Sequence, residues 1–184
     1  MMSDENAENQ FLKDLNSPNI RARGKLGSKQ NQLRYNLYKA AFERMESALA
    51  SDNVFEVISI ADSLITDRLQ ALIQFLRKEE PKQYTHVSIG KAQAVLIKEM
   101  RQRDFSFGDE IEVLVKEINS WVPHRNKAAH GFVVVTHKDI NEELEDRLKH
   151  LRKTAKDGLK LARKTTTMTT RTLRNLHSTN KSSG

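Results

Sequence analysis

Apolar side chains recur every three or four residues through most of this chain, which is the spacing of one face of an α-helix. The widest apolar stripe lies over residues 54–79. It is made of Val57, Ile58, Ala61, Leu64, Ile65, Leu69, Leu72, Ile73 and Leu76. A stripe of this width predicts a central helix that packs on more than one neighbour.

The same spacing predicts helices over 31–49, 90–103, 109–121 and 139–163. Ser51–Asp52–Asn53 separates the first two helices and supplies a cap for the second. Pro123 interrupts the register after 121, so residues 123–130 can form a short helix of their own, with Gly131 as its C-terminal cap. Asp139 is a candidate cap for the last helix, and the run of threonines from Thr165 to Thr170 is expected to end it, because β-branched residues are poor helix formers.

These elements predict an all-α protein, a bundle of four to five helices. We expect a flexible leader over 1–29, a helical domain over 30–164 and a disordered basic tail over 165–184. The single strand-like run, 132–136, is expected to be a brief extended linker. No internal repeat or sustained coiled-coil heptad occurs.

Charge divides the chain into two unlike parts. The net charge is +7, yet residues 147–184 carry 11 Lys and Arg against one acid, Asp157, so residues 1–146 are mildly acidic. A strongly basic arm attracts phosphate backbones without sequence preference. The alternative is a solvated helix face followed by a tail that keeps the protein soluble. The candidate nucleic-acid contacts are Lys153, Lys156, Lys160, Arg163, Lys164, Arg171 and Arg174.

Several function classes are excluded by what the sequence lacks. It has no Cys, so a thiol nucleophile or a Cys-ligated zinc site is excluded. The polar start has no secretory signal pattern, and no apolar run approaches the ~20 residues of a membrane span, so we expect a cytoplasmic protein without membrane contact. The histidines lack metal-ligand spacing, and we predict neither a metal nor a cofactor.

The segment from Pro123 to Gly131 carries the most suggestive chemistry. It places a permanent cation, Arg125, an amide, Asn126, and an imidazole, His130, within six residues. Arginine can neutralise a phosphate bidentately, and histidine can transfer a proton near neutral pH.

The string Trp-x-x-x-Arg-Asn-Lys-Ala-Ala-His-Gly at 121–131 resembles the motif region of HEPN-domain proteins. The match is to the family's Arg-x(4–6)-His motif with a polar residue after the arginine. It follows a long helix pattern, and a long second helix precedes both, as in that family. The resemblance in architecture covers about 30–164, and it is specific only across 121–131.

The resemblance implies a metal-independent endoribonuclease with paired motifs at a homodimer interface. His130 would transfer the proton, Arg125 would bind the phosphate and stabilise its charge, and Asn126 would orient the imidazole or contact the backbone. The products would be a 2′,3′-cyclic phosphate and a 5′-hydroxyl. A toxin or phage-defence role is implied, with RNA as substrate and an antitoxin or regulatory protein as partner.

Arg125 and His130 are five residues apart, about 140° around a regular helix. We expect the arginine to lie near a helix entry, or to face His130 of a second copy, so that the two groups can meet. His124 and Lys127 are auxiliary candidates. Asp62 and Asp67 interrupt the apolar stripe, and either can be an acidic group at the cleft or a carboxylate paired with a base such as Arg68.

Two readings of the motif remain open at the level of sequence. In the first, the chain is a nuclease. In the second, Arg125 pairs with an acid of the central helix, His130 packs under Trp121, and the chain is a non-catalytic helical module that binds a protein or nucleic acid.

Overall fold

The computed structural model describes residues 28–78, 87–130 and 144–182, and each element in these ranges is an α-helix. In chain order these are α2 (Ser28–Ala50), α3 (Val54–Arg77), α4 (Ile89–Gln102), α5 (Asp109–His130) and α6 (Leu144–Ser182). The predicted all-α class is therefore confirmed for this part of the chain. The predicted leader up to residue 27, the linker at 132–136 and the cap at Asp139 lie outside the described residues.

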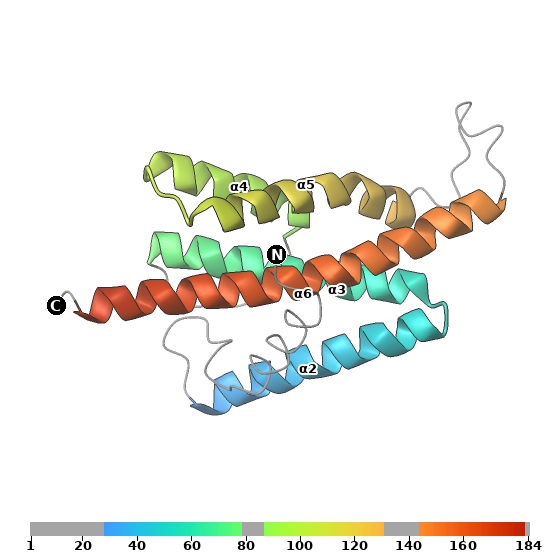
Figure 1. Ribbon diagram of the computed structural model, residues 1–184, viewed down its shortest axis with the longest axis horizontal. Helices are drawn as coiled ribbons and strands as arrows, with labels where there is room; N and C mark the ends of the chain where they lie inside the picture. Colours follow the sequence, from blue (N-terminus) through green and yellow to red (C-terminus); the bar gives the residue numbers. More distant parts are fainter. Residues whose placement is uncertain (1–27, 79–86, 131–143, 183–184) are drawn as a thin grey trace.

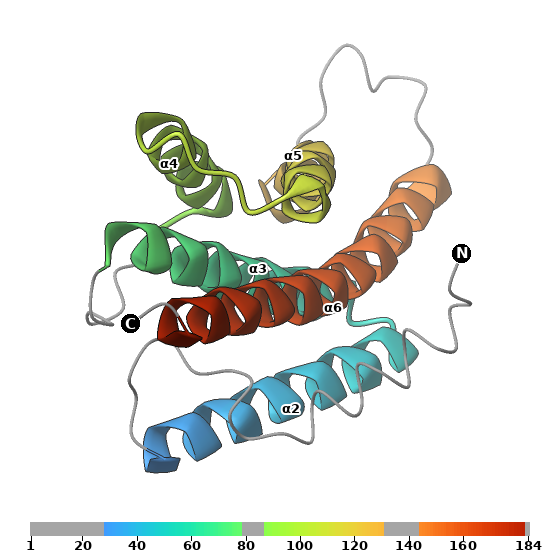
Figure 2. The same ribbon diagram turned by 60° about the vertical axis from the view of Figure 1, so that its left-hand side comes forward.

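The helices form three layers (Figures 1 and 2). α3 and α6 lie side by side in the middle, α4 and α5 cover one side of this pair, and α2 covers the other. α3 contacts all four other helices, as its wide apolar stripe predicts.

One apolar core runs through the layers, and α3 supplies its centre. Val57, Ile65, Leu69 and Leu72 are completely buried there. Each such side chain stabilises the fold by roughly 1.5–3 kcal/mol relative to an exposed position. The position of α3 therefore follows from its composition.

α5 is one continuous helix with Pro123 inside it, so the prediction of a helix that ends near Trp121 is wrong. Pro123 is exposed, and buried Trp121 and Ala128 lie on either side of it along the helix. Proline removes one backbone hydrogen bond, but here its ring faces solvent while both flanking segments are held on the core. Tertiary packing thus overrides the local break.

α6 also differs from prediction: it continues through the threonine run to Ser182, so the predicted disordered tail over 165–184 is wrong up to that residue. Thr165, Thr166, Thr169 and Thr170 are buried, followed by Leu173 one turn on. The hydroxyls of Thr166 and Thr169 donate to the carbonyls of Ala162 and Thr165, at 2.8 and 2.7 Å. This leaves the threonine methyl groups to pack, and burial outweighs weak helix propensity.

Three helix ends are followed by a residue other than glycine in the left-handed conformation. Asp52, Lys78 and Asp104 have φ of 58°, 55° and 46°. After α2 and α4, the next N–H groups, of Asn53 and Phe105, reach back to the carbonyls of Ala48 and Met100 at 2.7 and 3.0 Å. These are the backbone bonds of a Schellman-type helix end.

The predicted cap of α3 is only partly right. Asn53 occupies the N-cap position, but its side chain makes no capping bond to the backbone. Its amide instead donates to Glu56 at 2.8 Å. Ser88, in contrast, caps α4 by accepting a hydrogen bond from the N–H of Lys91.

Candidate functional site

Arg125 lies on the inward-facing stripe of α5. The buried members of that stripe are Ile111, Leu114, Ile118, Trp121 and Ala128, and the arginine falls between the last two at the same spacing. An apolar residue is the ordinary occupant of such a position. Its replacement by a permanent cation requires a partner inside the bundle, because an unpaired buried charge is strongly unfavourable.

Asp62 of α3 is that partner. Arg125 Nη2 lies 3.0 Å from Asp62 Oδ2, and the two side chains are only 20% and 17% exposed. Arg125 Nη1 also donates to Asn126 Oδ1 at 2.9 Å. The guanidinium is therefore held between the central helix and the next residue of its own helix, and its fork is fixed in direction.

His130 is the last residue of α5. Asn126, four residues earlier, occupies the same side of the helix, as predicted. Arg125 does not: the helix is regular through both positions, so they stand about 140° apart around its axis. The expectation that Arg125 lies at a helix entry is wrong, because it lies well inside α5.

The two acidic candidates of α3 have different roles in the structure. Asp62 contacts the motif, whereas Asp67 belongs to a network with α2. Asp67 accepts hydrogen bonds from Arg68 at 2.6 Å and Arg34 at 3.2 Å, and from the hydroxyl of Tyr38. Asp67 therefore joins helices rather than serving the motif.

From the sequence, only the pairing of Asp67 with Arg68 was anticipated; the contacts of Asp67 with α2 were not. The Arg68 side chain is 1% exposed, and its guanidinium carbon lies 4.7 Å from the centre of the Tyr38 ring. Burial is the largest cause that raises the pKa of Tyr38 above its ordinary value, and the Asp67 carboxylate adds to it. The signal in the sequence was Arg68 itself, because an arginine within an apolar stripe needs an anion beside it.

The remaining auxiliary candidates, His124 and Lys127, are exposed residues of α5. His124 is exposed and its ring stacks at a tilt on that of His150 in α6, with 5.2 Å between centroids. Lys127 is exposed. The structure therefore places both on the solvent-facing surface of α5, with His124 in contact with α6.

Trp121 fixes α5 against α6. Its indole N–H donates to the carbonyl of Thr154 at 3.0 Å, and its ring lies against Gly158. A Cβ added at Gly158 would stand 2.7 Å from the indole Cζ2. The glycine is therefore required by the close approach of the ring, and it sets the distance between the two helices one turn before Arg125.

The predicted nucleic-acid arm is an ordered helix face. Lys153, Lys156, Lys160, Lys164, Arg171 and Arg174 are exposed along α6, and Arg163 is partly buried. Arg163, Lys164 and Arg171 pair with Glu46, Glu117 and Glu110 of α2 and α5. Within the described ranges, Lys153, Lys160 and Arg174 have no carboxylate at ion-pair distance.

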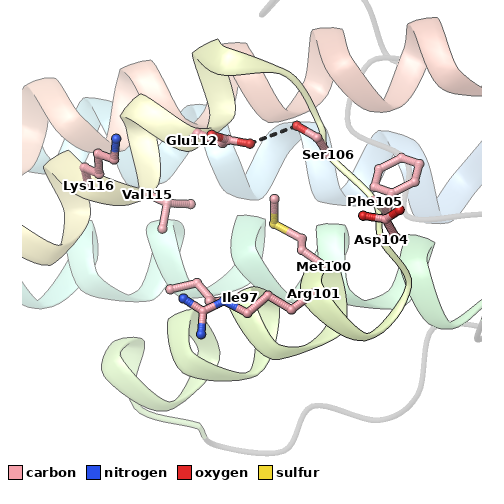
Figure 3. A pocket seen from close by; sticks show the side chains of 9 residues that line it. All are labelled: Ile97, Met100, Arg101, Asp104, Phe105, Ser106, Glu112, Val115 and Lys116. Carbon is pink, nitrogen blue, oxygen red and sulfur yellow. Dashed lines mark hydrogen bonds between the residues drawn. The ribbon is translucent and has the colours of Figure 1, made fainter.

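Cavities lie on either side of α5 in the described part of the chain. The first, of about 500 Å³, lies between α4 and α5 and has Ile97, Met100, Phe105 and Val115 in its lining. Figure 3 shows it, with the hydrogen bond from Ser106 to Glu112 closing one side. Its charged lining residues are two cations and two acids, namely Arg101, Lys116, Asp104 and Glu112.

The second cavity, of about 520 Å³, is a groove between α5 and α6. Its lining residues are Val113, Lys116, Glu117, Ser120, Trp121, His124, Asp157, Lys160, Leu161 and Lys164. It combines apolar side chains with three lysines and was not predicted, because its residues come from two helices far apart in sequence.

Within the described residues, no group of three His, Asp or Glu side chains is arranged to hold a metal ion. None of the helices described is long and apolar enough to cross a bilayer. Comparison with family models, with curated proteins and with solved structures finds no match to this chain. The HEPN resemblance therefore rests on the residues of the motif and their context alone.

Proposed function

We propose that this chain is a metal-independent endoribonuclease of the HEPN type that acts as a homodimer. The observation that carries the proposal is the motif arginine itself: Arg125 occupies an inward position, yet it is a cation held in a fixed direction by Asp62 and Asn126. A fixed guanidinium can bind a phosphate without first losing side-chain freedom. The long basic face of α6 supports RNA as the substrate.

In the proposed reaction, the ribose 2′-hydroxyl attacks the adjacent phosphorus and the 5′-oxygen of the next nucleotide leaves. One proton leaves the 2′-hydroxyl and one is delivered to the 5′-oxygen, and His130 serves one of these transfers. Arg125 stabilises the charge on the phosphate oxygens. Because the two positions lie about 140° apart on one helix, Arg125 of one copy would act with His130 of the other.

Cleavage of cellular RNA is toxic, so the proposal includes a toxin or phage-defence setting and a protein or trigger that restrains the activity.

The ion pair between Arg125 and Asp62 also supports a second function. If the ion pair between Arg125 and Asp62 serves only to join α5 to α3, the chain is a non-catalytic helical module that binds a protein or nucleic acid. The angular separation of Arg125 and His130 favours this alternative for a monomer.

The deciding experiment is RNA cleavage in the presence of EDTA, with mapping of the product ends. We expect cleavage that leaves 2′,3′-cyclic phosphates, and we expect His130→Ala to slow it at least about 100-fold, the lower range for loss of a general acid or base. Arg125→Lys keeps a cation beside Asp62 but loses the fork, so it should also be slowed, about tenfold or more, while the fold is kept.

Arg101→Lys on α4 is the matched control, since Arg101 is exposed and lies away from the motif. It should cleave as the unaltered protein does. If the unaltered protein and His130→Ala give the same RNA products at the same rate, the cleavage is a contaminant and the nuclease proposal fails. Sedimentation of the unaltered protein tests the dimer separately.

A further inference from the structure

The groove between α5 and α6 differs from the other cavity in its charge. Lys116, Lys160 and Lys164 line it, with His124 at the same groove, against the acids Glu117 and Asp157. Lys164 is engaged by Glu117 at 2.6 Å, whereas Lys116 and Lys160 have no ion-pair partner among the described residues. An anion entering the groove would therefore meet two lysines that do not first have to leave a carboxylate.

The groove has an apolar lining, formed by Val113, Trp121 and Leu161, against which a planar base can pack. Val113 is 48% exposed, while Trp121 and Leu161 are largely buried and present only part of their surfaces to the groove. A cavity of about 520 Å³ falls within the range of small-ligand sites. Apolar and aromatic surface beside cations is the combination by which proteins bind unpaired bases and their phosphates together.

The groove also continues into the basic face of α6. Lys153, Lys156, Lys160 and Lys164 fall within about 80° of arc and extend over about 16 Å of the helix axis. Along this line of cations, the groove is a point where a cavity with apolar lining adjoins them.

We propose that the α5–α6 groove binds single-stranded nucleic acid, with one base against Val113 and the accessible edge of Trp121 and the adjoining phosphates on Lys116 and Lys160. The strand then follows the basic face of α6. The proposal takes the ligand class from the proposed function and requires no cleavage chemistry, so it can stand if the nuclease proposal fails.

The chain carries its own reporter for this site, because Trp121 is its single tryptophan. The probe is a single-stranded 2′-O-methyl RNA of about 12 nucleotides. It has no free 2′-hydroxyl and therefore cannot be cut by the proposed reaction. Tryptophan emission and the anisotropy of a dye on the probe are followed in the same titration of the full chain. We expect the emission to change in proportion to binding.

Lys116→Gln with Lys160→Gln should weaken binding about tenfold and reduce the slope of log affinity against log salt by about 1.4, the value for two contacts to a single strand. Lys91→Gln with Lys98→Gln is the matched control, because both lysines are exposed on α4 and neither lines the groove. It removes the same charge, and we expect the emission change to remain and the affinity to fall much less.

Val113→Glu tests the apolar part at a position too exposed to threaten the core, with Leu37→Glu on α2 as its counterpart. Only the first should weaken binding. Unchanged tryptophan emission at saturation, an equal loss in the two lysine pairs, or equally tight binding of a duplex of the same length would each overturn the proposal. If the unaltered protein binds the probe in the groove but does not cleave RNA, the nuclease proposal fails and the groove proposal stands.

Discussion

At the scale of the residue, two arginines that lie within apolar stripes are each stabilised by an ion pair with an aspartate. Arg125 and Arg68 each occupy an inward position, and each finds an aspartate of α3, Asp62 and Asp67. The sequence shows that both acids interrupt the stripe of residues 54–79, but it does not say which partner each one takes. That choice depends on the angle at which α2 and α5 cross α3, which only the assembled bundle determines.

Glu99 gives a pH-dependent test at this scale. It is buried and accepts hydrogen bonds from Arg77 at 2.8 Å and Arg103 at 3.2 Å. The hydrogen bond from Arg77, joined by that from Arg103, holds the pKa of Glu99 below its ordinary value. A lowered pKa in the folded state adds stability above the unfolded value of about 4.3, and this stability is lost as the pH falls through the lowered pKa.

We therefore expect Glu99→Gln to unfold more easily than the unaltered protein at pH 7, with the difference shrinking as the pH falls below about 4. Urea unfolding followed by circular dichroism across this pH range measures it. Glu43→Gln, at an exposed carboxylate whose nearest cation is 3.8 Å away, is the control and should show little difference at any pH. If the free energy of unfolding of Glu99→Gln differed from that of the unaltered protein by the same amount at every pH, the expectation would be contradicted.

At the scale of the element, helix existence was predictable and helix length was not. The apolar spacing predicts each of the five helices in the described ranges, and the predicted ends of α2, α3 and α4 fall within a few residues of those in the structure. The two large errors, at Pro123 and at the threonine run, share a cause: a local signal to stop was overridden by burial of the residues beyond it. In α6, the positions of Thr165, Thr169 and Leu173 continue the helical spacing, which is visible only if threonine is counted as partly apolar.

The joint between α5 and α6 gives a test at this scale. We expect Gly158→Ala to destabilise the protein by about 1–3 kcal/mol, because the added methyl group would overlap the indole of Trp121 and force the helices apart. Thermal and urea unfolding measure the change. Combining it with Trp121→Phe, which removes the ring atom nearest the new methyl group, should recover part of the loss relative to Trp121→Phe alone. Gly90→Ala, in open space on α4, should be tolerated.

At the scale of the whole molecule, α6 is the element that closes the bundle. It packs along α3 and also contacts α5 and α2 (Figure 2). Sequence reasoning predicted an all-α bundle with a central helix, and the structure has both. It did not predict the groove, since that depends on α6 passing beside α5. A basic helix face was expected only as far as residue 163, and the structure extends the helix to Ser182. The arrangement specific to HEPN domains remains a proposal.

Removal of residues 165–184 tests this role of α6. If the segment were a tail, its loss would change only binding to nucleic acid. Because Leu173 and the four threonines are buried, we expect the shortened chain to lose at least about 3 kcal/mol of unfolding free energy. A chain that ends after Leu176 keeps these residues and is the control. An unfolding midpoint equal in the two chains would show that the end of α6 is dispensable for folding.

The left-handed residues after α2, α3 and α4 have a consequence for the evolution of this chain. Asp52, Lys78 and Asp104 each hold a conformation that glycine adopts with less strain. A sequence selected for maximal stability would be expected to carry glycine at such turns. This one keeps side chains there, so replacement of any of the three by glycine is a route by which its descendants could offset a harmful substitution elsewhere.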